Sequence, residues 1–227
     1  MEAPVTGAER RARIAATRVY LILSEAACRG PWREALASAL SSGVVGAVQV
    51  REKAMDDDAF LARALEVVEL ARAAGSLTIL NDRAHLVVAA GADGVHVGED
   101  DLDPAEARRL LGDDLLVGLS THDAREARAA RVRGADHGGL GPCFPTGTKR
   151  LARTPRGADL VRECLPAASV PLFPIGGITP ENASVLAAAG ATRAAVGAGI
   201  LSAADPAVAA RAIDTCLEAA PGACPHP

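Results

Sequence analysis

The sequence predicts an α/β protein, built as a single (β/α)8 TIM barrel. Short apolar runs alternate with segments of helical periodicity eight times along about 200 residues. Such alternation gives parallel strands, because each helix carries the chain back to the start of the next strand. Polar residues and glycines cluster directly after the apolar runs. The C-terminal ends of the strands are where a barrel of this kind holds its site.

A doubly wound open sheet is the alternative for the same alternation. It calls for a glycine-rich turn after the first strand, whereas Leu23, Ser24 and Glu25 stand there. The connections between the expected elements are short, and no linker or low-complexity segment divides the chain. These observations favour the barrel.

The elements are expected in strict alternation along the chain. The expected strands are 19–23, 47–51, 77–80, 94–97, 115–119, 136–140, 171–175 and 194–197. The expected helices are 32–42, 56–74, 83–90, 104–111, 124–133, 157–165, 180–189 and 207–219. Gly91, Gly134 and Gly190 end three of these helices, as glycines commonly do. Pro104 begins another, at a position where its missing N–H costs nothing.

The two ends of the chain fall outside the expected barrel. Residues 1–15 are expected to be a flexible leader, 16–220 the catalytic barrel domain, and 221–227 a loose tail. Three arginines near the start precede the apolar run 19–23, which is too short for the core of a signal peptide. No apolar run approaches the roughly 18–20 residues that would span a membrane.

The overall composition argues against nucleic acid and membranes as partners. The formal net charge is −4, so any anion must be bound by a local site. Aromatic residues form only 2% of the chain, too few for base-stacking platforms. The scattered cysteines have no metal-ligand spacing and predict reduced thiols in the cytoplasm; they are Cys28, Cys143, Cys164, Cys216 and Cys224. A homo-oligomeric state is left open.

Lysine, glutamine and asparagine are rare in this chain and fall where strands are expected to end. Among 24 basic residues only Lys53 and Lys149 are lysines, Gln49 is the one glutamine, and Asn81 is one of two asparagines. Lysine and arginine differ around a phosphate, so a lysine kept against the arginine bias indicates a specific need. Chance placement of so few residues is the alternative.

The second strand ends in an alternating polar stretch. Gln49, Arg51 and Lys53 stand at i, i+2 and i+4, so they share one face of an extended segment. Two cations and an amide directed into a barrel mouth predict an anionic ligand. Surface salt bridges to Glu52 and Asp56 are the alternative.

Phosphate-binding features follow the last three strands. After the sixth strand come Thr146, Gly147, Thr148 and Lys149, which supply hydroxyls, a free backbone and a charge. The pairs Gly176-Gly177 and Gly197-Ala198 follow the seventh and eighth strands, where barrels bind phosphate with backbone N–H groups. The sequence therefore predicts two anion sites, one cationic and one built from backbone.

Two carboxylates after adjacent strands predict a Mg²⁺ site. Asp82 and Asp101 offer the hard oxygen ligands that Mg²⁺ shares with phosphate and water. Helix capping is the alternative, by Asp82 for the helix at Arg83 and by Asp100, Asp101 or Asp103 for the helix at Pro104. His122 is a candidate general base or a structural histidine, and His96 is expected to pack inside the barrel.

A set of short motifs in this order resembles thiamine-phosphate synthase, also called thiamine phosphate pyrophosphorylase. The motifs are Gln49-Val50-Arg51-Glu52-Lys53, Asn81-Asp82, Gly94-Val95-His96-Val97-Gly98, Gly118-Leu119-Ser120-Thr121-His122, Gly139-Leu140-Gly141-Pro142, Thr146-Gly147-Thr148-Lys149 and Ile175-Gly176-Gly177-Ile178. Their order and spacing match the family over residues 18–215. Each motif alone is weak, and the set is specific.

The resemblance implies a transferase of thiamine biosynthesis. It would join 4-amino-2-methyl-5-(diphosphooxymethyl)pyrimidine to a thiazole phosphate, giving thiamine phosphate and pyrophosphate. The implied pyrimidine diphosphate contacts are Gln49, Arg51, Lys53, Asn81, Ser120 and Lys149, and the implied Mg²⁺ ligands are Asp82 and Asp101. The implied thiazole phosphate contacts are Thr146, Thr148, Gly177, Gly197 and Ala198. Catalytic roles are implied for Arg51, Lys53, Ser120 and Lys149.

Three positions depart from the family pattern, and two rival functions share parts of it. Ala198 stands where serine is frequent, Glu99 where glutamine is frequent, and His137 where tyrosine is usual. A thiazole tautomerase, which is similar in fold, would use His122 as acid or base and lacks the loop that ends in Lys149. A non-catalytic sensor of a thiamine precursor would need neither the Mg²⁺ pair nor the lysines.

Overall fold

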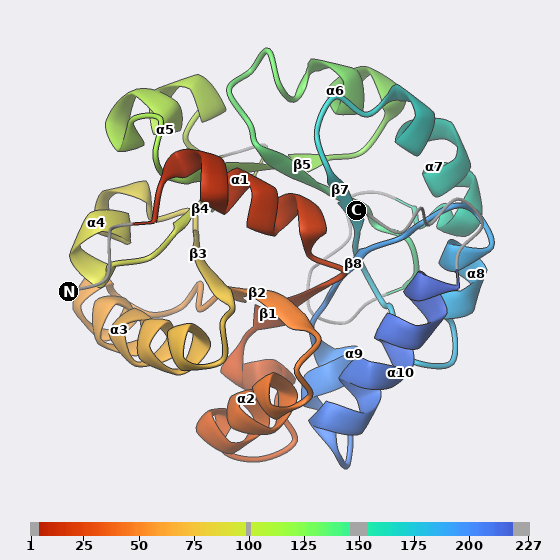
Figure 1. Ribbon diagram of the computed structural model, residues 1–227, viewed down its shortest axis with the longest axis horizontal. Helices are drawn as coiled ribbons and strands as arrows, with labels where there is room; N and C mark the ends of the chain where they lie inside the picture. Colours follow the sequence, from red (N-terminus) through yellow and green to blue (C-terminus); the bar gives the residue numbers. More distant parts are fainter. Residues whose placement is uncertain (1–4, 99–100, 146–153, 220–227) are drawn as a thin grey trace.

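Eight parallel strands form a closed barrel in the computed structural model, which describes residues 5–98, 101–145 and 154–219. Hydrogen bonds join the strands in the order β7-β6-β5-β4-β3-β2-β1-β8. A parallel bridge between Ile175 and Ala195 brings the chain just after β7 against β8, and the two edges of the sheet meet there. Helices surround the strands on the outside (Figure 1). The predicted (β/α)8 barrel is confirmed.

The strands fall within two residues of the expected positions. Their bounds are β1 Val19–Leu23, β2 Val45–Val50, β3 Leu77–Asn81, β4 Gly94–Val97, β5 Leu116–Thr121, β6 His137–Leu140, β7 Leu172–Pro174 and β8 Ala194–Val196. The larger helices are α2 Trp32–Ser41, α3 Asp57–Ala73, α5 Pro104–Leu111, α6 Ala124–Ala129, α7 Gly157–Cys164 and α10 Pro206–Glu218. The shorter ones are α4 Val87–Ala90, α8 Ala183–Ala187 and α9 Ala198–Leu201.

Side chains of each strand divide between two hydrophobic layers. Outward residues such as Val95 and Val97 of β4 pack against the helices in the larger core. Inward residues form a smaller cluster that fills the barrel interior, namely Ile14, Tyr20, Ala47, Leu77, Ile79, Leu116, Phe173 and Ala195. The barrel is therefore packed through its middle, and its ligands must bind at one end.

A helix that the sequence analysis does not predict closes the N-terminal end of the barrel. Residues 1–15 were expected to be flexible, but α1 spans Gly7–Ala16 and lies across the barrel in Figure 1. Thr6 and Glu9 form a capping box at its start. Arg10 bonds Asp93 at 2.9 Å, and Ile14 is fully buried in the inner cluster. The expectation of a loose leader is therefore wrong for the described residues from Gly7 on.

Several helices are shorter than their sequence pattern indicates. The segment expected as one helix from 83 to 90 begins as a 3-10 turn, Ala84–Leu86, before α4. The segment expected from 180 to 189 is helical only over α8, because the side chain of Asn182 bonds the preceding loop instead. The expected tail 221–227 lies outside the described residues.

Candidate active site at the barrel mouth

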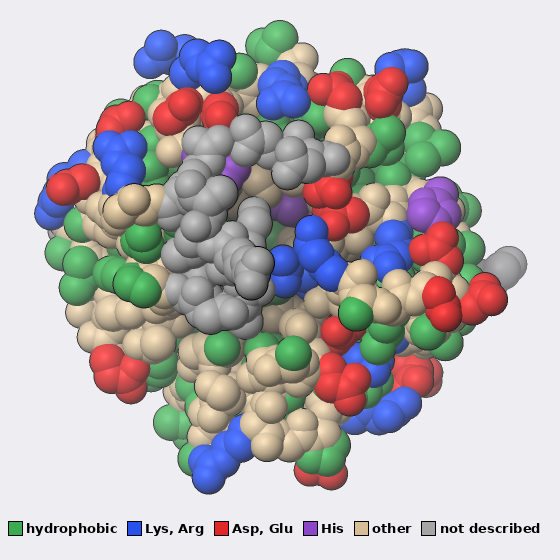
Figure 2. Space-filling view, turned by 180° about the vertical axis from the view of Figure 1, so that it is seen from behind, with side chains coloured by type: hydrophobic (Ala, Val, Ile, Leu, Met, Phe, Trp, Pro, Cys, Tyr) green, Lys and Arg blue, Asp and Glu red, His purple; other side chains and the backbone are tan. Residues whose placement is uncertain are grey.

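The candidate site lies at the end of the barrel opposite α1, where the C-terminal ends of all eight strands meet. Figure 2 views this face, and basic, acidic and histidine side chains gather near its centre. The predicted site residues from β2 to β5 lie at or just beyond the strand ends, from Gln49 to Ser120. The fold therefore brings together Gln49 and Ser120, which are 71 positions apart in the sequence.

Strand β2 directs one amide inward and carries two cations beyond its end. Gln49 is buried, and its Nε2 donates to the Tyr20 hydroxyl at 3.0 Å. The backbone N–H of Arg51 donates to the Leu23 carbonyl, and within the described residues the Arg51 guanidinium forms no ion pair. Lys53 lies 3.2 Å from an Asp82 carboxylate oxygen and is about half exposed.

The alternative of salt bridges from Lys53 to Glu52 or Asp56 does not hold among the described residues. Glu52 instead accepts a hydrogen bond from the Glu25 backbone at 2.6 Å and pairs with Arg63 at 3.2 Å. Asp56 caps α3 by accepting from the Ala59 N–H. Lys53 therefore lies at the barrel mouth, where it pairs with Asp82.

Asp82 adopts a backbone conformation that is unusual for its residue type. Its φ is +63°, the one left-handed value among the described non-glycine residues. Its N–H donates to the His96 carbonyl at 2.9 Å, which holds the turn after β3 in place. Strained backbone of this kind costs on the order of 1 kcal/mol and is frequent at functional sites. The turn directs the carboxylate toward Asn81, whose amide donates to it, and toward Lys53.

Two carboxylates face each other at this turn. Burial raises the pKa of Asp82, the adjacent Asp101 carboxylate raises it further, and Lys53 opposes both effects. Asp101 is fixed by the Gly98 N–H, which donates to it at 2.9 Å. A Cβ at position 98 would lie 2.6 Å from this carboxylate oxygen, so a larger residue there would displace the carboxylate.

Capping falls to a different aspartate. Asp103 accepts from the Ala105 N–H and caps α5, while the 3-10 turn after Asp82 has no side-chain cap. Neither Asp82 nor Asp101 therefore serves as a helix cap.

The facing carboxylates of Asp82 and Asp101 are suited to binding a hard divalent cation. Within the described residues no third His, Cys, Asp or Glu joins them. Two carboxylates suit Mg²⁺, which commonly takes one or two protein carboxylates and completes its coordination with phosphate oxygens and water. A cation between them would also remove the repulsion that raises the pKa of Asp82.

The two histidines near β5 have different surroundings. Nε2 of His96 lies 3.2 Å from the Ser120 hydroxyl, inside the barrel. His122 lies beyond the end of β5, where both its ring Nδ1, at 3.1 Å, and its backbone N–H are held by the Glu126 carboxylate of α6. The Glu126 carboxylate on α6 therefore fixes the orientation of the His122 ring through one nitrogen, an arrangement that both interpretations of this residue allow.

The glycine pair after β7 supports the beginning of the loop after β6. The N–H groups of Cys143 and Phe144 donate to the carbonyls of Ile175 and Gly176 at 2.8 and 2.9 Å. Gly177 has φ +61°, and a Cβ there would lie 2.3 Å from the Pro145 carbonyl. The chain leading to Thr146, Thr148 and Lys149 thus packs directly on the Gly176-Gly177 turn, although those three predicted residues lie outside the described ones.

The thiol inside this loop takes no part in the site. Burial raises the pKa of Cys143 to about 12, which keeps the thiol protonated and unreactive at neutral pH.

Asn182 is a residue that the sequence interpretation misses. Its side chain accepts from the Thr179 N–H and donates to the Gly177 carbonyl, both at 2.8 Å, and so fixes the turn after β7. Gly197 and Ala198 begin α9 beside this turn, and a Cβ on Gly199 would lie 2.1 Å from the Ile178 carbonyl. The scarcity of asparagine in the chain is the sequence signal that marks Asn182, as it marks Asn81.

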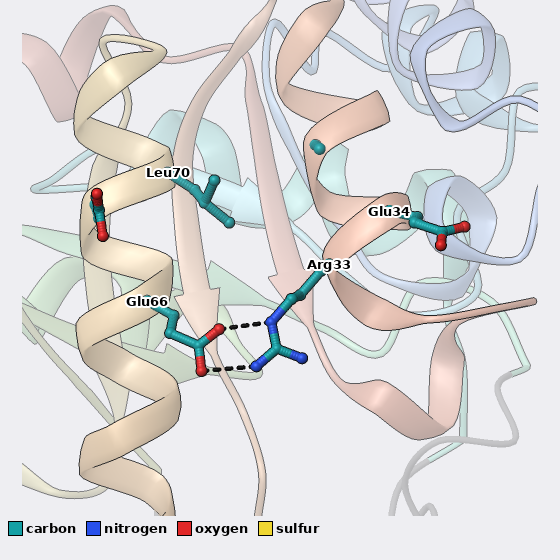
Figure 3. Close-up of a pocket in the computed structure, with 6 residues that line it drawn as sticks. Arg33, Glu34, Glu66 and Leu70 are labelled. Atoms are coloured by element: carbon teal, nitrogen blue, oxygen red, sulfur yellow. Dashed lines mark hydrogen bonds and ion pairs between the residues drawn. The ribbon is translucent and has the colours of Figure 1, made fainter.

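A shallow pocket on the outer surface is unrelated to this mouth. It lies between α2 and α3, where Arg33 and Glu66 form a two-pronged ion pair with contacts of 2.6 and 2.7 Å (Figure 3). The pair satisfies both charges, and none of the predicted site residues lines the pocket. The candidate site is therefore placed at the strand ends and not in this pocket.

The fold and the mouth define a (β/α)8-barrel protein that carries cationic side chains and two facing carboxylates at the C-terminal ends of its strands. The chain belongs to the family described as thiamine monophosphate synthase, whose model matches residues 19–200. Thiamine-phosphate synthase of Anaeromyxobacter dehalogenans is 44% identical over 93% of this chain and 92% of its own length. Thiamine-phosphate synthase of Gloeobacter violaceus is 43% identical over 91% of this chain, which spans 59% of that relative's length.

A solved structure extends the likeness to the whole barrel. Thiamine phosphate pyrophosphorylase from Pyrococcus furiosus superimposes with a TM-score of 0.81 at 26% identity. The match covers 93% of this chain and all of the other. No helix in the described part of the chain is both long and apolar enough to cross a bilayer.

Proposed function

We propose that this chain is a thiamine-phosphate synthase, a transferase of thiamine biosynthesis. It joins the pyrimidine diphosphate to a thiazole phosphate and releases pyrophosphate. The observation that carries the proposal is the grouping of Arg51, Lys53, Asp82 and Asp101 at one barrel mouth, in a chain of the thiamine monophosphate synthase family. The identity of 44% to a full-length relative of that name supports it.

The chemistry needs no protein nucleophile. The carbon–oxygen bond to pyrophosphate breaks with its electron pair on the leaving oxygen, and the methylene carbon becomes a cation stabilised by the aminopyrimidine ring. The thiazole nitrogen then supplies the pair for the new carbon–nitrogen bond. The tasks left to the protein are to hold the two reactants in line and to stabilise the departing charge.

Arg51, Lys53 and Lys149 are proposed to take the departing negative charge. Arg51 has no ion pair with another described residue, so its guanidinium is available to an anion. Gln49, Asn81 and Ser120 are proposed to bind the pyrimidine diphosphate from the inner faces of β2, β3 and β5. Thr146, Thr148, Gly177, Gly197 and Ala198 are proposed to bind the thiazole phosphate, mainly through hydroxyls and backbone N–H groups.

Asp82 and Asp101 are proposed to hold Mg²⁺, which would supply positive charge to the diphosphate oxygens. The chain's own contribution is to keep the two carboxylates together in spite of their repulsion. It does so through the Gly98 N–H, the Asn81 amide and the left-handed backbone of Asp82.

Small-molecule substrates and a cytoplasmic location belong to the same proposal, and its catalytic unit includes α1, which begins at Gly7 and not at residue 16. Reduced thiols are consistent with that compartment, since the described cysteines are free. The tautomerase alternative is disfavoured because it lacks the loop that ends in Lys149, and this sequence contains that loop. A non-catalytic sensor is disfavoured because it has no need for cations and paired carboxylates at one mouth.

The experiment follows thiamine phosphate in a mixture of protein, pyrimidine diphosphate, thiazole phosphate and Mg²⁺. We expect product that disappears with EDTA and falls about 10²–10³-fold in Lys149→Ala, as for loss of other charge-stabilising donors. Lys149→Arg is the matched control, because it keeps the charge and changes the shape. Folded protein that binds both substrates and forms no product would leave the sensor as the function. Isomerisation of the thiazole abolished by His122→Ala would establish the tautomerase.

A further inference from the structure

The interior of the barrel holds a polar pair just beneath the proposed site. Nε2 of His96 and the hydroxyl of Ser120 are 3.2 Å apart. His96 is 9% exposed and Ser120 is half-buried, so the imidazole end of the pair is shielded from solvent. Hydrogen bonds are stronger in such surroundings than in water, and they fix side-chain orientation more firmly.

Strand register explains how the pair forms. His96 of β4 is aligned with Gly118 of β5, and Ser120 lies two residues further along β5 on the same inner face. The ring of His96 reaches forward past this neighbour toward the mouth. Its inward direction follows from the alternation in β4, where Val95 and Val97 pack outward.

Gly118 makes the room that the ring of His96 occupies, and Gly139 lies at ordinary contact distance from the same ring. A Cβ on Gly118 would lie 2.5 Å from His96 Nδ1 and 2.5 Å from His137 Nε2. A Cβ on Gly139 would lie 3.5 Å from His96 Cε1. Because a real side chain at position 118 would overlap both imidazoles, this glycine allows two histidine rings to lie side by side within the barrel.

His137 closes the remaining side of the ring. Its centroid lies 5.8 Å from that of His96, and it also packs against Tyr20 and edge-on to Phe173. His137 is fully buried, and burial lowers its pKa to about 3, so it stays neutral. A neutral aromatic neighbour restricts the His96 ring without adding a charge beneath the site.

We propose that His96 is a positioning residue, which holds the Ser120 hydroxyl in one orientation for the bound pyrimidine diphosphate. The inference rests on the proposed function, because it assumes that Ser120 contacts that substrate. The ring nitrogen and the hydroxyl each supply one partner to the bond, so the hydroxyl keeps its remaining hydrogen-bonding capacity for the ligand. Fixing this direction before binding lowers the cost of ordering the site.

The test is a double-mutant cycle on His96 and Ser120. Steady-state kcat and KM for the pyrimidine diphosphate are measured for His96→Leu, Ser120→Ala and the double variant. We expect His96→Leu to lower kcat/KM about 10–100-fold, the usual cost of losing a group that orients a site residue. In the Ser120→Ala background the same change is expected to cost less than about twofold. His96→Gln, which keeps a polar nitrogen near the Nε2 position, is expected to recover most of the loss.

Thr121→Val is the matched control. Thr121 is the next residue of β5, is fully buried, and donates to the Gly139 carbonyl at 3.0 Å, so its loss perturbs the same strand without touching Ser120. Its effect on kcat/KM is expected to be small and additive with Ser120→Ala. A His96→Leu loss that is equally large in the Ser120→Ala background would mean that His96 only supports the fold, and would overturn the proposal.

A ring-nitrogen NMR spectrum separates this inference from the proposed function. We expect the Nε2 resonance of His96 to shift in Ser120→Ala and to stay in place in Thr121→Val. An unchanged resonance in Ser120→Ala would show that His96 Nε2 does not bond to Ser120. It would overturn the inference even if the wild-type protein forms thiamine phosphate. Wild-type protein that forms none, with the resonance shift intact, instead contradicts the proposed function.

Discussion

Replacing His137 with leucine is expected to make the protein less sensitive to acid. His137 is fully buried, and neither ring nitrogen has a hydrogen-bond partner in the described structure. Burial, followed by the nearby His96, lowers its pKa from the ordinary value of 6.5 to about 3. Between these two values the unfolded chain binds a proton at His137 and the folded chain does not, so stability falls as the pH falls from 6.5 toward 3.

The size of the effect follows from the two pKa values. At pH 5, about 1.5 pH units below the ordinary pKa, protonation of His137 stabilises the unfolded chain by about 2 kcal/mol relative to the folded one. At pH 7 this stabilisation is close to zero. We therefore expect the wild-type free energy of unfolding to drop about 2 kcal/mol more than that of His137→Leu between pH 7 and pH 5.

The assay is urea denaturation of both proteins at the two pH values. Phe173→Leu is the control, because it alters the same aromatic cluster and removes no titratable group. It is expected to lower stability by a similar amount at both pH values. Parallel loss of stability in the wild-type protein and His137→Leu would refute the reasoning, since a solvated His137 would have the same pKa in both states.

Four further changes test the packing and the loops. Ile14→Ala is expected to lower the free energy of unfolding by about 2–4 kcal/mol in urea denaturation, because a fully buried side chain leaves a cavity in the barrel interior. Gly118→Ala is expected to cost about 1–3 kcal/mol by overlap with two imidazoles, and Gly139→Ala, with ordinary contact distances, less than about 1 kcal/mol. Asn182→Ala is expected to raise KM for the thiazole phosphate about tenfold, with little change for the pyrimidine diphosphate, because the turn at Gly177 loses its support.

Local patterns predicted the barrel well because each strand carries its own signal. Strands such as Val19–Leu23 and Gly94–Val97 are short apolar runs between turn residues, and the structure places both at the expected bounds. The α1 helix was missed because Ile14 is its one large apolar side chain, and contacts from distant parts of the chain, such as Asp93 with Arg10, stabilise it. The capping box of Thr6 and Glu9 was the one local signal for it.

The sequence predicted which residues belong to the candidate site, but not which of them contact each other. The rarity of lysine indicated Lys53, and the structure adds its contact with Asp82. The sequence could not decide which aspartate caps α5, because several stand within reach of its start; the structure assigns that role to Asp103. The bond between His96 and Ser120 depends on the register of two strands, which no local pattern contains.

The most direct test of the account is the Mg²⁺ dependence of thiamine phosphate formation in the wild-type protein, Asp82→Asn and Asp103→Asn. Both variants lose one carboxylate in the same region, but Asp103 caps a helix and its asparagine can still do so. We predict that Asp82→Asn loses most activity and needs far more Mg²⁺, while Asp103→Asn keeps the wild-type Mg²⁺ response. Wild-type Mg²⁺ dependence in Asp82→Asn would contradict the assignment of this mouth as the metal-assisted site.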